Sequence, residues 1–211
     1  MDQTVTKDDC CTASETRDDN YDLIVVGAGS AGVSASITAA DAGKRVALIG
    51  HGTTGGTCVN VGCVPSKAMI RAAEAVHGGA SAARFPGVEP CDHAVDWGAV
   101  VQGTTDLVEE MRHKKYIDLL PAYKSVTYIE DGPARLVEGG VAVGGRVISA
   151  PRVLIATGSR PHLPAIEGID TVEPLDSTDL LTLPDRPESI LVLGGGYIGC
   201  ELAQMASRLG V

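Results

Sequence analysis

The sequence predicts an α/β fold, because one strand–turn–helix pattern occurs in it twice. The first copy covers residues 24–32, where an apolar segment leads into Gly-Ala-Gly-Ser-Ala-Gly. The second copy covers residues 191–199, where a similar segment leads into Gly-Gly-Gly-Tyr-Ile-Gly. The offset of 167 residues also relates Gly43 to Gly210. Each copy is therefore expected to form a buried strand, a glycine turn and a helix that a glycine closes.

Both glycine turns have the GxGxxG spacing of a nucleotide-binding motif. The first glycine permits a sharp turn, the second lets backbone amides approach a pyrophosphate, and the third allows helix and strand to pack closely. The helix N-terminus behind the turn favours the anionic phosphates. One copy alone is weak evidence, since a glycine-rich turn can also bind nothing. Because both copies follow apolar segments and precede alanine-containing helices, we predict two nucleotide-binding units.

The segments between the two copies predict further helices and strands. Helices are expected from near Cys63 and over residues 97–119, with a loop over residues 85–90 between them. Strand-like runs cover residues 125–129, 141–147 and 152–155, and the last of these ends in the small-residue turn Ala156-Thr157-Gly158. Five prolines follow Gly158 and indicate a connecting segment, so a domain boundary is expected between residues 160 and 187.

Two cysteines, Cys58 and Cys63, stand five positions apart between Gly-Gly-Thr and Val-Pro-Ser-Lys. The helical pattern that follows places Cys63 at a helix start, and Pro65 suits the first turn of a helix because its missing donor would be unused. Free amides and the positive end of the helix stabilise a thiolate there. The pattern therefore predicts a reactive thiolate in a redox-active pair.

A zinc site and a plain buried pair are the competing interpretations of these two cysteines. Zinc ordinarily needs two further ligands at matching spacing, and neither His51 nor His77 supplies that arrangement. Cys91 in an expected loop and Cys200 on the second helix are most simply structural or incidental.

The composition excludes several classes of function. With 17 basic and 27 acidic residues the formal charge is −10, which argues against nucleic-acid binding. No apolar run is long enough for a membrane-spanning helix. Residues 1–20 are acidic and contain no apolar run for a signal peptide, so we expect a disordered tail and a cytoplasmic protein. Six cysteines in such a protein are expected to be reduced or catalytic.

From residue 21 to residue 211 the chain resembles the class I pyridine nucleotide-disulfide oxidoreductases, on the glycine motifs and the Thr-Cys-Val-Asn-Val-Gly-Cys-Val-Pro-Ser-Lys run. The resemblance implies an FAD-binding Rossmann-like domain over residues 21–160, a linker over 161–187, and the truncated start of a second Rossmann-like, NAD(P)H-binding domain over 188–211. It also implies Cys58 as the interchange thiol and Cys63 as the flavin-facing thiolate.

The resemblance implies two sets of cofactor-binding residues. The FAD set is Gly27, Ala28, Gly29, Ser30, Ala31, Gly32, Gly56, Thr57, Lys67, Ala134, Ala156, Thr157 and Gly158. The nicotinamide dinucleotide set is Gly194, Gly196, Tyr197, Ile198, Gly199 and Glu201. Lys67 is expected to pair with Glu201 beside the flavin as a catalytic couple, and Tyr197 to cover the nicotinamide pocket. A surface ion pair and ordinary packing are the competing interpretations of these residues.

The chain departs from the family pattern at Gly50. A carboxylate about 20 residues past the glycine motif normally holds the adenosine ribose hydroxyls, but here the second strand runs into Gly50 and His51. We expect FAD to bind still, but more weakly at this end, and Gly50→Glu to tighten its binding.

Within the family, the segment from Thr57 to Ala73 and the run Met111-Arg-His-Lys-Lys-Tyr116 are most similar to the members that reduce Hg(II). NADPH-driven reduction of Hg(II) to Hg(0) is therefore the expected activity of the parent protein, with Cys58 and Cys63 as transient mercury ligands. Glutathione reductases tend to carry a second lysine where Ser66 stands, whereas dihydrolipoamide dehydrogenases share Pro-Ser-Lys. Reduction of an organic disulfide therefore stays the alternative.

A non-enzymatic fragment that binds FAD or metal through thiols is the alternative from another class. The resemblance implies a C-terminal domain with dimer contacts beyond Val211, so we expect a homodimeric parent and no turnover by these 211 residues alone. Cys10 and Cys11 are expected either to capture mercury as adjacent soft ligands or to have no specific role.

Overall fold

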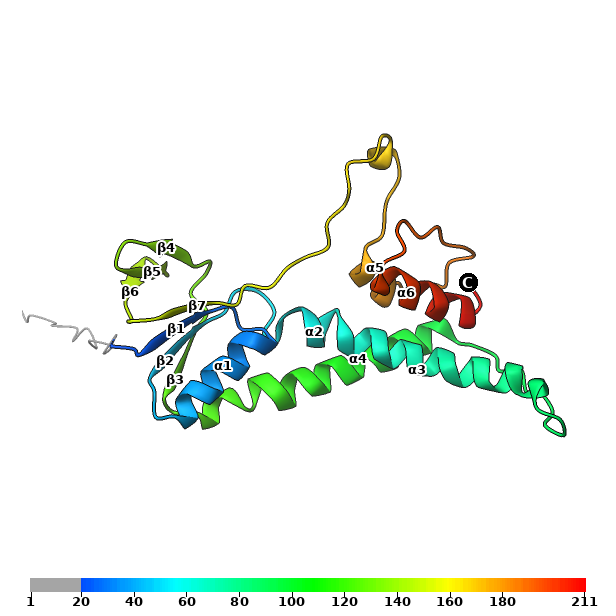
Figure 1. Cartoon of the computed structure of the whole chain (residues 1–211), viewed down its shortest axis with the longest axis horizontal. Coiled ribbons are helices and arrows are strands. Elements are labelled where there is room, and N and C mark those ends of the chain that lie inside the picture. The colour runs from blue at the N-terminus through cyan, green and yellow to red at the C-terminus, as the bar shows by residue number, and fades with distance from the viewer. Residues whose placement is uncertain (1–19) are drawn as a thin grey trace, which may run out of the picture.

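The computed structural model describes residues 20–211 and has the predicted α/β architecture (Figure 1). Two small sheets lie at one end of the molecule, α5 and α6 at the other, and the long helices α3 and α4 extend between them. Four short helical turns, η1 to η4, cover Ser81–Arg84, His113–Ile117, Leu120–Ala122 and Ile169–Thr171. The main elements are β1 (Leu23–Val26), α1 (Ser30–Asp41), β2 (Val46–Ile49), α2 (Gly56–Asn60), α3 (Cys63–Ala80), α4 (Trp97–Arg112), β3 (Val126–Ile129), β4 (Arg135–Val137), β5 (Gly140–Val143), β6 (Arg146–Ile148), β7 (Val153–Ile155), α5 (Ser177–Thr182) and α6 (Tyr197–Arg208).

The main sheet is parallel, with the strand order β3-β2-β1-β7. β1 pairs with β2 on one side and with β7 on the other, and Ile24 and Val25 at its centre are fully buried. Every residue of β2 is buried as well. A strand paired on both edges and covered on both faces needs a continuous apolar run, which is the pattern that the sequence has in both places.

The second sheet is an antiparallel meander, β4-β5-β6, and it differs from the prediction. The sequence favours one strand-like run over residues 141–147, but the structure has two strands that pair with each other. Gly144 and Gly145 turn the chain between them, with φ of 56° and 76°, a region that favours glycine. The predicted strands at 125–129 and 152–155 are present as β3 and β7.

The predicted helix starting at Cys63 is present as α3, and the loop over residues 85–90 has neither helix nor strand. Asp96 caps α4, because its Oδ1 accepts a hydrogen bond of 3.0 Å from the amide of Ala99. The helix predicted over 97–119 ends earlier, at Arg112, and one π-helical turn, His113–Ile117, follows it.

The two copies of the sequence repeat fold differently. The first forms β1, a glycine turn and α1, and Gly43 follows with φ of 74°. In the second, α6 forms and Gly210 follows with φ of 92°, but residues 191–193 form no strand. The prediction of a buried strand there is wrong: Leu191 is 87% exposed, and no strand among residues 20–211 lies beside it to pair with it.

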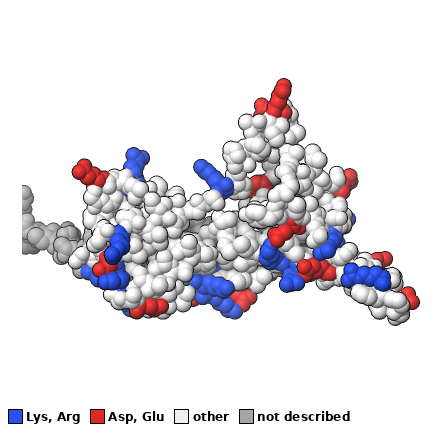
Figure 2. Space-filling view, viewed as in Figure 1, with Lys and Arg blue, Asp and Glu red and all other residues white. Residues whose placement is uncertain are grey.

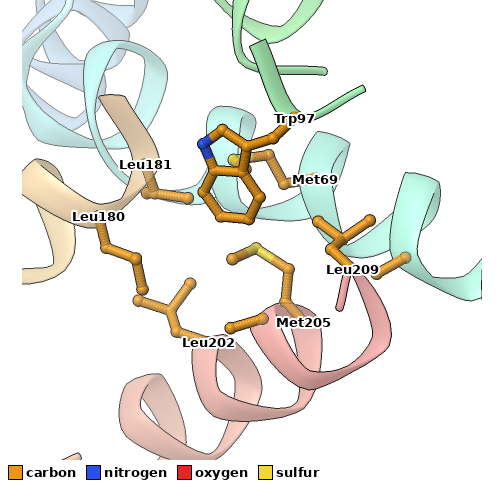
Figure 3. Close-up of a cluster of buried hydrophobic side chains, with 9 residues drawn as sticks. Met69, Trp97, Leu180, Leu181, Leu202, Met205 and Leu209 are labelled. Carbon is orange, nitrogen blue, oxygen red and sulfur yellow. The ribbon is translucent and has the colours of Figure 1, made fainter. Parts of the chain in front are cut away.

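A hydrophobic cluster fixes α6 against the long helices rather than against a sheet (Figure 3). Met205 of α6 and Leu209, which follows the helix, are fully buried in one cluster with Met69 of α3. Trp97, at the start of α4, lies in the same cluster, and its Nε1 donates a hydrogen bond of 2.8 Å to the carbonyl oxygen of Leu183. This packing connects the second glycine motif to the helix that begins with Cys63.

Charged side chains of both signs are interspersed on the face of the molecule that Figure 2 shows. Within residues 20–211, no helix combines the length and the apolar character needed to cross a membrane.

We predict that Met205→Ala lowers the free energy of unfolding by about 2–5 kcal/mol, because it leaves a cavity in a fully buried cluster. Urea denaturation followed by far-ultraviolet circular dichroism measures the change. Leu191→Ala is the matched control, since that side chain is 87% exposed, and its effect should stay within about 0.5 kcal/mol. Equal losses from the two variants would contradict the packing described here.

Candidate nucleotide cavity and redox cysteine pair

A cavity of about 540 Å³ opens at the carboxyl ends of the parallel strands, where open α/β sheets bind their ligands. It extends from the glycine turn after β1 to Cys58. Lys67 and Gly32 of the expected FAD set lie outside its wall. The expected residues that line it are Gly27, Ala28, Gly29, Ser30, Ala31, Gly56, Thr57, Ala134, Ala156, Thr157 and Gly158.

The glycine turn is packed so closely that two of its glycines have no room for a side chain. A Cβ on Gly27 would lie 2.2 Å from the carbonyl oxygen of Ala156, and its φ is 115°. A Cβ on Gly32 would lie 1.8 Å from the carbonyl oxygen of Gly27. Gly32 thus contributes to the cavity indirectly, because it lets α1 approach the turn.

The N-terminus of α1 faces this cavity with its positive end uncompensated by the protein. Gly29 caps the helix without a side-chain hydrogen bond, and the first turn contains no acidic residue. Ser30 and Ala31, the first two residues of α1, line the cavity. Unpaired amides at the positive end of a helix suit the pyrophosphate of a dinucleotide such as FAD.

The two cysteines lie on consecutive helices at the end of the cavity. Cys58 belongs to α2 and lines the cavity, whereas Cys63 is the first residue of α3 and is exposed outside the wall. Both are free thiols, and their side chains are close enough to hydrogen-bond with each other. The structure thus brings the predicted pair together, with Cys58 nearer the glycine turn's cavity.

The pKa of the Cys63 thiol is raised above its ordinary value, opposite in direction to the shift expected from its position at a helix start. The main cause is the hydrogen bond with the Cys58 side chain, followed by partial desolvation and the charge of Cys58. The local backbone hydrogen bond and the positive charge of Lys67 lower this pKa, but their effect is smaller. With both thiols free, the partner thiol outweighs the helix terminus, and the thiolate at Cys63 stays a prediction.

Asn60, between the two cysteines, secures the cysteine segment, and the sequence reasoning missed it. Its Nδ2 donates hydrogen bonds of 3.0 Å to the carbonyl oxygen of Thr54 and 2.9 Å to that of Gly56. Arg112, at the end of α4, donates to its Oδ1 over 3.2 Å. An amide flanked by valines in a cysteine-containing run was the available signal, since an Asn side chain has both donors and an acceptor and can join two segments at once.

Lys67 and Glu201 form the expected ion pair, which joins α3 to α6. Their side chains are 54% and 45% exposed, so solvent screens the attraction. Because Lys67 lies one helical turn after Cys63, the pair connects the thiol end of α3 to the second glycine motif.

The second glycine motif repeats the packing of the first but lines no described cavity. A Cβ on Gly199 would lie 2.9 Å from the carbonyl oxygen of Gly194. The close approach of Gly32 to the carbonyl oxygen of Gly27 is the corresponding contact in the first motif. Gly194 and Gly196 have open space around them, Ile198 is 46% exposed, and Tyr197 is 81% exposed. The structure therefore brings the expected nicotinamide set together on the turn and first residues of α6.

Gly50 lies on the cavity wall, as expected for the end of β2, but a side chain does not fit there as the sequence suggested. Its Cβ would lie 2.2 Å from the hydroxyl oxygen of Tyr128. Gly50→Glu, which was expected to tighten FAD binding, therefore requires the Tyr128 ring to move.

The remaining cysteines do not join the pair. Cys91 and Cys200 are exposed free thiols, and the Sγ of Cys200 donates to the carbonyl oxygen of Gly195 over 3.5 Å. Cys10 and Cys11 lie outside the described residues.

Comparison with known proteins supplies the family. A family profile described as "Pyridine nucleotide-disulphide oxidoreductase" matches residues 21–211. The chain belongs to this family. The α/β fold with its parallel sheet agrees with that membership.

Two curated relatives of this chain are named mercuric reductase. The chain is 45% identical over 198 residues to a mercuric reductase of Streptomyces lividans, which covers 90% of this chain and 41% of that protein. It is 42% identical to a mercuric reductase of Lysinibacillus sphaericus, with 92% of this chain and 35% of that protein covered. The chain thus spans well under half the length of these relatives.

Solved structures of a flavoprotein disulfide reductase are similar to this chain in fold. The HOCl-induced flavoprotein disulfide reductase RclA from Escherichia coli is 32% identical, with a TM-score of 0.74 over 90% of this chain and 40% of that one. The Cu(II) complex of the same reductase also gives a TM-score of 0.74, at 31% identity over 89% of this chain and 40% of that one.

We predict opposite shifts of the Cys63 pKa from two substitutions. The starting protein keeps Cys58 and Cys63, and its remaining cysteines are replaced by serine. Cys58→Ala removes the main cause of the raised pKa, so the thiolate forms at lower pH and alkylation by iodoacetamide becomes faster at a given pH. Lys67→Met removes a positive charge that lowers the pKa, so the alkylation profile moves to higher pH. Alkylation rates measured against pH give both shifts, and movement of the two profiles in the same direction would refute this account.

Proposed function

We propose that the parent protein of this chain binds FAD in the cavity and uses NADPH to reduce Hg(II) to Hg(0) at Cys58 and Cys63. The observation that carries the proposal is a pair of free thiols, one of which lines the same cavity as a glycine turn suited to a pyrophosphate. The names of the curated relatives support mercury as the substrate.

The cavity residues fit FAD in shape and charge. The amides at the start of α1 and the turn at Gly27 and Gly29 would hold the pyrophosphate, and the turn after β7, Ala156 to Gly158, would contribute a second contact with FAD. Gly56, Thr57 and Ala134 complete the wall. When bound, FAD supplies two-electron transfer between a reduced nicotinamide and the thiol pair.

The thiols provide the soft ligands that Hg(II) prefers. We propose that Cys58 and Cys63 bind the ion as thiolates and that the two electrons of NADPH then convert Hg(II) to Hg(0), with NADP⁺ and one proton as the other products. The family resemblance implies Cys58 as the interchange thiol and Cys63 as the flavin-facing thiolate, whereas in this structure Cys58 is the one of the two that lines the cavity. Binding of Hg(II) displaces the thiol protons, so the raised pKa of Cys63 makes this step favour higher pH.

The second glycine motif is proposed as the site for NADPH. Gly194, Gly196, Ile198 and Gly199 would contact the dinucleotide, and exposed Tyr197 would cover the nicotinamide. The ion pair of Lys67 and Glu201 would stabilise negative charge on the reduced flavin from the first turns of α3 and α6. We propose the corresponding domain division at residues 160 and 187, and a cytoplasmic homodimer for the parent.

Reduction of an organic disulfide is the second candidate, and one observation favours it. The solved structures similar to this chain include a flavoprotein disulfide reductase. The same thiol pair can exchange with a disulfide, with no mercury involved.

The two candidates separate in one assay on the full-length protein. We expect NADPH oxidation that depends on Hg(II), and we expect Cys58→Ser or Cys63→Ser to reduce its rate by about 10³-fold or more. Cys91→Ser, which changes an exposed thiol outside the site, is the matched control and should leave the rate unchanged. Reduction of NAD⁺ by dihydrolipoamide without any response to Hg(II) would replace the mercury proposal by the disulfide one. No turnover with either substrate would favour a binding protein without catalysis.

A further inference from the structure

The end of β2 lacks the group that ordinarily holds an adenosine ribose. Gly50 follows Ile49 on the cavity wall, 21 residues after Gly29, where a dinucleotide-binding unit usually has a carboxylate. Gly50 is buried and offers the ribose no side chain. The polar side chains on the wall beside it are those of His51, Thr53 and Thr54, in the loop after β2, and of Tyr128 on the neighbouring strand.

Tyr128 of β3 occupies the space that a side chain at position 50 would use. β3 pairs with β2 so that Tyr128 is opposite Leu48, which directs its ring along the end of β2. A Cβ on Gly50 would lie 2.2 Å from the Tyr128 hydroxyl oxygen and 2.7 Å from two ring carbons. The phenol group and a carboxylate side chain at position 50 are thus mutually exclusive in this arrangement.

The Tyr128 hydroxyl has both the access and the hydrogen-bonding capacity for a ribose. Tyr128, Thr54 and Gly50 all line the cavity. The hydroxyl oxygen lies 3.0 Å from Oγ1 of Thr54, which fixes its position. It donates to Glu130 only over 3.5 Å, so its hydrogen is available to a closer acceptor.

Burial raises the pKa of Tyr128, and nearby Glu130 raises it further, while the Thr54 hydrogen bond acts in the opposite direction. The phenol therefore stays protonated at neutral pH and keeps its donor. A hydroxyl both donates and accepts, so it can pair with either hydroxyl of a ribose, whereas a carboxylate can only accept.

We infer that Tyr128, positioned by Thr54, makes the hydrogen bond to the adenosine ribose hydroxyls of FAD that a carboxylate at position 50 makes elsewhere. This inference rests on the proposed FAD site and names a contact within it. It replaces a charged contact with a neutral one, and the glycine at position 50 is what makes room for it.

The test measures binding of ADP and of 2′,3′-dideoxy-ADP to the flavin-free full-length protein by calorimetry. The unsubstituted protein should bind ADP more tightly than the dideoxy compound. Tyr128→Phe should weaken ADP binding by about five- to tenfold, the effect of one lost neutral hydrogen bond, and leave dideoxy-ADP binding unchanged. Tyr123→Phe removes a hydroxyl outside the cavity wall and is the matched control.

A pair of exchanges tests the steric part. Gly50→Glu alone should weaken ADP binding, because it displaces the Tyr128 ring, and Gly50→Glu with Tyr128→Ala should restore it by returning a carboxylate to the ribose. Tighter binding of ADP by Gly50→Glu alone would overturn the exclusion between the two side chains.

The outcomes distinguish a failure of the Tyr128–ribose hydrogen bond from a failure of the proposed FAD site. Retained preference for ADP over dideoxy-ADP in Tyr128→Phe, or its loss in Glu130→Gln instead, would overturn the assignment to Tyr128 while leaving the FAD site intact. If the unsubstituted protein bound neither ADP nor FAD, the proposed FAD site would fail and the ribose contact with it. Unchanged binding of dideoxy-ADP by Tyr128→Phe also shows that the variant is folded.

Discussion

The close approach of backbones at the turn after β1 is the constraint on which the cavity depends. Gly27 packs against the backbone of Ala156, just after β7. Gly32 of α1 packs in turn against the carbonyl group of Gly27. Any side chain at these positions would push α1 or β7 away, and the unpaired amides of α1 would no longer face the space between them. Three backbone segments in direct contact therefore define one wall of the site, and side chains only complete it.

α3 joins this wall to the rest of the molecule. Cys63 is its first residue, and Lys67, one turn later, pairs with Glu201 of α6. Met69, two residues after Lys67, lies in the hydrophobic cluster that contains α6. The position of the thiol thus depends on packing at both glycine motifs. The hydrogen bonds of Asn60 fix the other side of the cysteine segment against α4.

Much of the fold could be predicted because its determinants are local. The GxGxxG turns, the apolar runs of β1 and β2 and the helix start at Cys63 depend on residues adjacent in sequence. The failures involve partners distant in sequence. Residues 191–193 have the composition of a strand but no strand beside them among the described residues, and the Gly144-Gly145 turn divides a run that looked continuous.

The site shows the same division. The positions of Cys58, Gly27 and the Lys67–Glu201 pair followed from motifs. The direction of the Cys63 pKa did not, because it is decided by the distance to a second thiol rather than by the helix start. Tyr128 could not be found from the sequence either, since its relation to Gly50 exists only once β3 has paired with β2.

Trp97 is the single tryptophan of the chain, and it lies where α3, α4, α5 and α6 meet. Its indole is 4% exposed and donates its hydrogen bond to the carbonyl of Leu183, on the segment that leads to the second glycine motif. The tryptophan fluorescence of the protein therefore comes from this contact between the four helices. Separation of α5 and α6 from the long helices would change the emission while the parallel sheet stayed folded, so tryptophan fluorescence reports whether the second glycine motif stays attached to the rest of the molecule.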